Sequence, residues 1–259
     1  MNRNTDSEDI LGYKVTTKNT SEIVQDLISN MANAQGTDSV ACINPHSAVE
    51  ASKDDAFKNA LIRSDWLLPD GVGIVLASRL GKGRITRRIT GFDFFHETMT
   101  QLNASGDRSC FFLGSTEDIL SKIRDRCEGD FPNVRIAGVY SPPYRQAFAE
   151  EDYKLMIDAV NSVKPDVLWV GLTAPKQELF VDACKESLET GAIGAIGAVF
   201  DFYAGTVKRP GPLARRLGLE WLVRLLGEPR RLWRRTIISM PVFLLQAVAY
   251  NFRRSEESS

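Results

Sequence analysis

Short apolar runs alternate with longer stretches of helical periodicity along most of the chain, and this alternation limits the possible folds more than any other feature. Runs of this length that end in turn-forming residues are typical of buried strands. Helical stretches of about 10–20 residues between them require crossover connections, which join parallel strands. The sequence therefore predicts an α/β fold with a largely parallel sheet and helices on both faces. The predicted strands are 40–44, 66–68, 110–114, 134–139 and 167–172, with a further apolar run at 192–199.

The predicted helices follow the strands closely. Helices are expected over 47–63 and 72–80, and residues 115–118 have the composition of a helix cap. In sheets of this kind ligands bind beyond the carboxyl ends of the strands. Several predicted strands end in Gly, Asn or Asp, which suits close approach of the backbone to a ligand. We therefore expect the functional site at this edge of the sheet.

The C-terminal part of the chain differs in charge from the rest. Residues 205–259 carry eleven Lys and Arg against four acids, a net charge of +7, whereas residues 1–204 carry 21 basic and 29 acidic residues, a net charge of −8. Arginines in the C-terminal part are interleaved with Leu and Trp at helical spacing. These differences divide the 259-residue chain into a body, 1–204, and a basic helical appendage, 205–259. Because its arginines are interleaved with apolar residues, the appendage is not expected to bind nucleic acid.

The apolar stretch 235–253 leaves two alternatives open. It is too short and too interrupted to span a bilayer, which takes about 20 mostly apolar residues. Flanking arginines and aromatic side chains favour a helix that lies in the membrane interface. The other alternative is an ordinary helix packed on the body. On the first alternative the protein is peripheral on the inner face of the plasma membrane.

Composition excludes several other kinds of site. The four cysteines are scattered without CxxC spacing, which argues against a zinc ribbon, a redox motif or a disulfide scaffold and fits a reducing cytoplasm. The polar, acid-bearing N-terminus does not look like a secretory signal peptide. Only two histidines are present, and no Asp-x-Asp triplet occurs. We therefore expect no metal site and no cofactor.

Three clusters of residues, taken in order, resemble one known family. The first comprises Ile-Asn-Pro at 43–45, Leu-Pro-Asp-Gly-Val-Gly at 68–73 and Arg-Ile-Thr-Gly-Phe-Asp at 88–93. The second comprises residues 170–178, which include Ala-Pro-Lys-Gln-Glu, and residues 197–205. The third is the arginine-rich segment 219–235. Over about residues 38–250 the chain resembles the WecG/TagA/CpsF family of bacterial glycosyltransferases.

This resemblance implies a Rossmann-like core and an inverting transfer of a sugar from a UDP-sugar to a polyprenyl-diphosphate-linked saccharide at the cytoplasmic membrane face. Members of the family make cell-surface polysaccharides, and their donor sugars include N-acetylmannosamine, its uronic acid and glucose. Another nucleotide-sugar enzyme on the same fold, or a non-catalytic membrane-binding protein, is the alternative. The missing G-x-G-x-x-G and Tyr-x-x-x-Lys patterns count against an oxidoreductase or epimerase. The sequence leaves open whether the protein forms a homo-oligomer.

The resemblance places the catalytic base at Asp70, where a turn aspartate that caps the next helix is the alternative. Asn44 is expected to orient hydroxyl groups of a substrate, or to form an Asx-turn before Pro45. The family usually has Thr two positions before this Asn, whereas this chain has Cys42, whose thiol is a weak hydrogen-bonding group. Arg88 can hold a diphosphate through two parallel hydrogen bonds, or lie on the surface.

The remaining candidates are weaker by sequence alone. Gln177 is expected to bind substrate, while Lys176 and Glu178 beside it have the pattern of surface charges. Asp201 either binds sugar hydroxyls or caps a turn, and Gly114 and Gly171 allow backbone contact with a phosphate or sugar. The family resemblance implies that the appendage folds over the site and supplies arginines to the UDP diphosphate, with attraction to anionic lipid as the alternative. These arginines are Arg224, Arg231 and Arg234.

Overall fold

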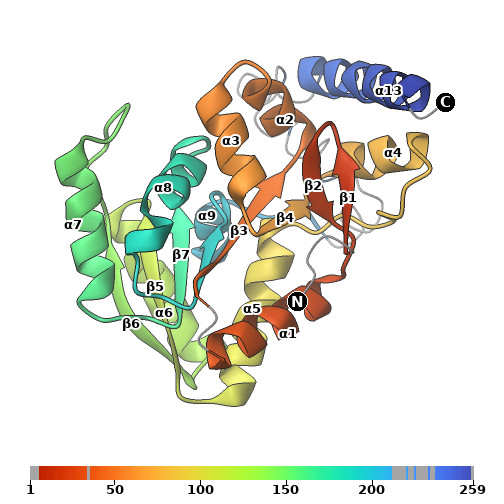
Figure 1. Cartoon of the computed structure of the whole chain (residues 1–259). Coiled ribbons are helices and arrows are strands. Elements are labelled where there is room, and N and C mark those ends of the chain that lie inside the picture. The colour runs from red at the N-terminus through yellow and green to blue at the C-terminus, as the bar shows by residue number, and fades with distance from the viewer. Residues whose placement is uncertain are drawn as a thin grey trace.

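The computed structural model describes residues 6–33, 36–211, 220, 225, 233 and 237–257. Six strands form one parallel sheet in the order β4-β3-β8-β7-β5-β6 (Figure 1). Each predicted strand is present, and the parallel sheet is confirmed. The strands are β3 (Asp38–Ile43), β4 (Trp66–Pro69), β5 (Arg108–Gly114), β6 (Val134–Tyr140), β7 (Val167–Gly171) and β8 (Ala192–Ala195).

Helices cover both faces of the sheet, as the crossover connections require. One face carries α1 (Thr20–Ala32), α5 (Gly91–Ser105), α6 (Glu117–Asp130) and α9 (Val199–Tyr203). The other face carries α2 (Pro45–Ala51), α3 (Asp55–Arg63), α4 (Val72–Leu80), α7 (Glu150–Asn161) and α8 (Lys176–Cys184). Because side chains alternate along a strand, each central strand contributes to the apolar cores on both faces.

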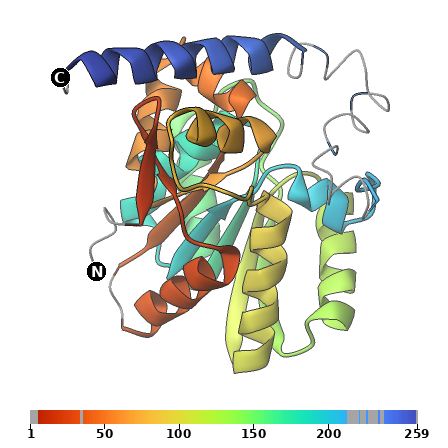
Figure 2. The same ribbon diagram turned by 90° about the vertical axis from the view of Figure 1, so that its right-hand side faces the viewer.

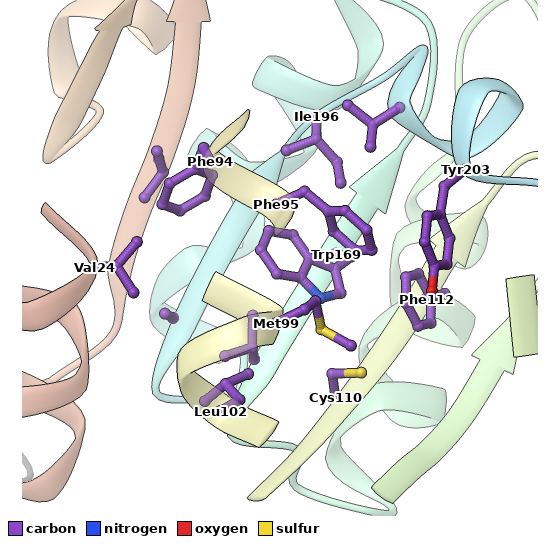
Figure 3. Packing of buried hydrophobic residues seen from close by; sticks show 14 of the residues in the cluster. Val24, Phe94, Phe95, Met99, Leu102, Cys110, Phe112, Trp169, Ile196 and Tyr203 are labelled. Atoms are coloured by element: carbon purple, nitrogen blue, oxygen red, sulfur yellow. The ribbon is translucent and has the colours of Figure 1, made fainter. Parts of the chain in front are cut away.

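Trp169 of β7 lies at the centre of the first core (Figure 3). Its indole ring makes edge-to-face contacts with Phe94 at 5.8 Å and Phe95 at 5.1 Å between ring centroids, and all three side chains are buried. The neighbouring residues Leu168 and Val170 point into the core on the opposite face. Aromatic packing of this kind holds α5 firmly on the sheet, and this matters because residues at the beginning of α5 border the functional site.

The helix predicted over 47–63 is two helices, so that prediction is wrong in its bounds. Asn44 caps α2, which ends at Ala51, and α3 then begins after Asp54. The Asp54 side chain accepts a hydrogen bond from the Phe57 backbone N–H at 3.1 Å, so it starts a helix instead of lying within one. An antiparallel hairpin of β1 (Ser7–Ile10) and β2 (Tyr13–Thr16), which was not predicted, packs beside them.

The apolar stretch near the C-terminus forms α13 (Ser239–Glu257), which contacts α2 and α4 along one side of the body (Figure 2). Phe243 and Ala247 are buried against the body, as the packed-helix alternative requires. Leu245 and Phe252 on the same helix are 71% and 67% exposed. None of the helices in the described ranges is both long and apolar enough to cross a bilayer.

Candidate active site

A large cavity of about 1320 Å³ opens at the carboxyl edge of the sheet. Its walls come from residues at or directly after the carboxyl ends of all six strands of the sheet and from the helices that follow them, as expected for an open α/β sheet. Of the candidate residues that the structure describes, all but one line this cavity. The lining candidates are Asn44, Asp70, Arg88, Gly171, Gln177 and Asp201.

Asp70 follows β4 directly, and its backbone N–H donates to two carbonyl oxygens. The Asp70 N–H is 2.8 Å from the Ile43 carbonyl oxygen and 2.9 Å from that of Leu68, so it lies between two adjacent strands. Gly71 then adopts φ +94°, a conformation that favours glycine, and α4 begins at the next residue. The Gly71 turn therefore presents the Asp70 carboxylate to the cavity from a rigid backbone.

Asn44 caps the following helix, and its side chain also borders the cavity. Its Oδ1 accepts hydrogen bonds from the N–H groups of His46 and Ser47, each at 3.0 Å, which is the cap of α2. Its Nδ2 makes no hydrogen bond to any described residue, and the side chain borders the cavity. The oxygen therefore fixes the side chain, and the amide N–H group can face a substrate.

Cys42 also lines the cavity. Burial raises the pKa of its thiol well above the usual value, and the charges of Asp70, Glu178 and Asp93 raise it further. The thiol therefore stays protonated and unreactive at neutral pH. At the position where the resemblance leads us to expect a hydroxyl group, this chain has a neutral, weakly hydrogen-bonding group.

Gln177 and Glu178 begin α8 and are both buried, with 6% and 5% exposure. The Gln177 Nε2 group donates to Glu178 Oε1 at 2.9 Å, which fixes the orientation of the amide. Gln177 Oε1 is buried and has no hydrogen-bond partner among the described residues. The interpretation of Glu178 as a surface charge is wrong, because the turn before α8 directs this side chain inward. Lys176 is partly exposed, and its ammonium nitrogen lies 5.1 Å from the centre of the Tyr144 ring.

The two glycine candidates act through close packing. A Cβ on Gly171 would lie 2.5 Å from the Phe200 ring, and one on Gly114 would lie 2.6 Å from the Gly171 carbonyl oxygen. Gly114 is the candidate that does not line the cavity, so its predicted contact with a ligand has no support here. Its neighbour Ser115 does line the cavity, and Thr116 caps α6 as predicted. Asp201 lies on α9 at the cavity wall.

Two further points concern arginines and metals. Arg224, Arg231 and Arg234 lie outside the described residues, so their predicted contact with a diphosphate stays a prediction. Within the described ranges no three His, Cys, Asp or Glu side chains are grouped so that they could hold a metal ion. Arg88, by contrast, is described, and its Nη1 donates to the Glu220 carboxylate.

Comparison with known proteins identifies the kind of enzyme to which this cavity belongs. Residues 8–257 match the family described as the glycosyl transferase WecG/TagA/CpsF family. The chain belongs to the WecG/TagA/CpsF family. It is therefore a glycosyltransferase, and the resemblance drawn from its three residue clusters is confirmed.

Several curated relatives of this glycosyltransferase share one name, N-acetylglucosaminyldiphosphoundecaprenol N-acetyl-beta-D-mannosaminyltransferase. The protein from Bacillus subtilis (strain 168) is 34% identical over 206 residues, which cover 80% of this chain and 77% of the relative. The one from Bacillus spizizenii is 31% identical over 79% and 76% of the two chains. The one from Staphylococcus aureus (strain MW2) is 24% identical over 93% and 92%.

The cavity of this WecG/TagA/CpsF protein includes residues that the sequence did not single out. His46 lies two residues after Asn44, and its Nδ1 is 3.0 Å from Ser239 Oγ at the beginning of α13. Tyr144 borders the cavity and is 98% exposed, so its ring offers a stacking face. Arg209 also borders the cavity. The sequence signal for Arg209 was only its position at the beginning of the basic appendage.

Proposed function

We propose that this glycosyltransferase moves one sugar from a UDP-sugar to a saccharide carried on a polyprenyl diphosphate, with inversion, during synthesis of a cell-surface polysaccharide. The relatives' shared name supports a polyprenyl-diphosphate acceptor and favours N-acetylmannosamine over its uronic acid or glucose. The observation that carries the proposal is the cavity at the carboxyl edge, which brings together Asp70, Arg88 and Gln177 in a chain of this family.

In the proposed reaction the acceptor hydroxyl oxygen attacks the anomeric carbon from the side opposite the nucleotide. Asp70 accepts the hydroxyl proton as the new carbon–oxygen bond forms. The bond from the anomeric carbon to the β-phosphate oxygen breaks, and UDP leaves with the electron pair. The rigid strand end that carries Asp70 supports this role, since a general base must be held in one geometry.

Negative charge develops on the departing diphosphate, and cationic side chains near it stabilise that charge. Arg88 borders the cavity and suits this role, because a guanidinium binds phosphate oxygens through parallel hydrogen bonds. Arg224, Arg231 and Arg234 are proposed to join it from the appendage. Glu220 and Met240, which belong to the appendage, already line the cavity. Their position supports a division into a catalytic body, 1–204, and an appendage, 205–259, that completes the site.

The same appendage is proposed to hold the protein on the inner face of the plasma membrane. The exposed face of α13 carries large apolar side chains, and basic residues are concentrated in this part of the chain. An amphipathic helix with these properties binds at the interface of an anionic bilayer. A lipid-linked acceptor would then meet the cavity at the membrane surface, where its diphosphate lies.

The decisive experiment is incubation with a panel of UDP-sugars and polyprenyl-diphosphate-linked acceptors, followed by mass spectrometry of the lipid product. We expect one hexosyl unit to be added to the acceptor and one UDP to be released for each unit. Release of UDP without a modified acceptor, or no product with any pair, would contradict the proposal. Turnover is expected to persist in EDTA; loss in EDTA with recovery on adding Mg²⁺ would contradict metal independence alone.

A further inference from the structure

The beginning of α5 provides a rigid anchor beside the cavity. Thr90 caps this helix, and its hydroxyl and the Asp93 carboxylate hydrogen-bond reciprocally to the backbone in a capping box. Arg209, more than one hundred residues later, is bound to the same cap. Its Nη2 donates to Asp93 Oδ1 at 2.8 Å and to Thr90 Oγ1 at 3.3 Å, and its guanidinium lies 4.1 Å from the centre of the Phe92 ring.

These contacts have an electrostatic consequence at Asp93. Burial alone would raise the pKa of this carboxyl, but the hydrogen bonds from Arg209 and Thr90 outweigh it and hold the pKa below its usual value. Asp93 is therefore ionised at neutral pH and pairs with Arg209. With the stacking on Phe92, this pairing restricts the guanidinium in several directions. Arg209 is thus a fixed part of the cavity wall.

Glu220 of the appendage lies between this fixed arginine and Arg88. One carboxylate oxygen accepts a hydrogen bond from Arg88 Nη1, and the other is 3.5 Å from Arg209 Nε. The side chains of Arg88, Glu220 and Arg209 are only 20%, 12% and 16% exposed. Charged pairs at such exposure are screened little by solvent and depend on each other for compensation.

We infer that Glu220 is a positioning residue, which sets Arg88 for the donor diphosphate by linking it to the Arg209–α5 anchor. This inference rests on the proposed role of Arg88. An unrestrained arginine loses rotamer entropy when it is fixed, and the Glu220 contact meets that cost before the nucleotide arrives. The carboxylate also offsets the repulsion between two guanidinium groups. Because Glu220 belongs to the appendage, the affinity for the donor then depends on the position of the appendage.

The variant Glu220→Gln tests the inference, because a purely electrostatic effect and a positioning effect of Glu220 would change UDP affinity in opposite directions. Removing a negative charge near the cavity should tighten UDP binding if Glu220 merely competes with the diphosphate. If Glu220 positions Arg88, the same change should weaken UDP binding about tenfold, as expected for loss of a charged hydrogen bond. Isothermal titration of UDP into the full-length protein gives the sign directly. Glu220→Asp should recover part of the affinity, and Glu128→Gln, on the exposed surface of α6, should change it less than twofold.

A double-mutant cycle with Arg88→Ala separates positioning from a merely structural role. In the Arg88→Ala background, Glu220→Gln should have less than a twofold further effect on the Kd for UDP. An unchanged tenfold effect in that background, or tighter binding in the single variant, overturns the inference. Wild-type affinity in Arg88→Ala would instead refute the proposed role of Arg88. Thermal unfolding of each variant is the check that the protein stays folded.

Discussion

The amino edge of the parallel sheet, where the strands begin, and the carboxyl edge, where they end, carry similar polar residues in different surroundings. At the amino edge, Asp65 accepts hydrogen bonds from Ser39 N–H at 2.9 Å and Ser39 Oγ at 2.8 Å. Asp166 repeats this arrangement with Ser109, at 2.8 and 2.7 Å. Each aspartate also pairs with a cation, Lys185 or Arg108. These carboxylates join neighbouring strands and do not line the cavity at the carboxyl edge, so we assign their interactions to stabilising the fold.

The carboxyl edge places its polar groups around the cavity instead. Gln177 Oε1 is buried without a hydrogen-bond partner among the described residues, an arrangement that costs stability unless a ligand provides a donor. The comparison supports the proposal that the carboxyl edge carries the chemistry, while the amino edge holds neighbouring strands together. Variants at the two edges should therefore separate stability from transfer.

The largest effect is expected at the carboxyl edge. Asp70→Asn removes the proposed base and should lower kcat by ~10²–10⁴-fold, while UDP affinity and the free energy of unfolding change little. Steady-state kinetics with the donor–acceptor pair found by the panel gives kcat, and calorimetry gives the Kd for UDP. A kcat within threefold of the wild type would remove Asp70 from the mechanism.

The next effect is expected at the amino edge. Asp166→Asn weakens its charged hydrogen bonds to Ser109 and Arg108 and should lower the free energy of unfolding by ~2 kcal/mol. Transfer per folded molecule should stay at the wild-type level. Asp118→Asn is the control, because its pairing with Lys122 is exposed and worth at most about 0.5 kcal/mol. Urea denaturation measures the difference, and equal losses in both variants would show that the amino edge adds no special stability.

The stability that the amino edge contributes should also depend on pH. Burial tends to raise the pKa values of Asp65 and Asp166, but their hydrogen bonds and cationic neighbours outweigh it and lower both. A carboxyl whose pKa is lower in the folded than in the unfolded state stabilises the fold above the unfolded value, about 3.9. This stabilisation is lost as the pH falls below that value. Urea titrations should show a shallower acid loss for Asp166→Asn than for the wild type; identical slopes would contradict the assigned cause.

The smallest effect concerns α13, which lies beyond the carboxyl edge. Leu245→Ser removes an exposed apolar side chain and should weaken binding to phosphatidylglycerol vesicles about tenfold. The free energy of unfolding should change by less than about 0.5 kcal/mol. Leu155→Ser on α7, where the leucine is 50% exposed, is the matched control. Vesicle sedimentation that finds the two variants equal would mean that α13 has no special part in membrane binding.

The sequence by itself determined the strands, most of their bounds and the edge at which the site lies. Apolar runs and turn residues are local signals, so β3, β4, β5, β6 and β7 could be predicted directly. The residue clusters also predicted Asp70, Asn44, Arg88 and Gln177 as site residues, because each belongs to a motif, and all four line the cavity. The break between α2 and α3 could have been found from Asp54, a favoured helix-capping residue.

Only the tertiary structure decided what depends on contacts between distant parts of the chain. The strand order, the burial of Glu178 and the contact of Glu220 with Arg88, 132 residues away, leave no periodic signal in the sequence. Such pairings form because burying a charge costs much less free energy when an opposite charge lies beside it. A local pattern can show that an arginine is present, but only the folded chain determines which carboxylate holds it.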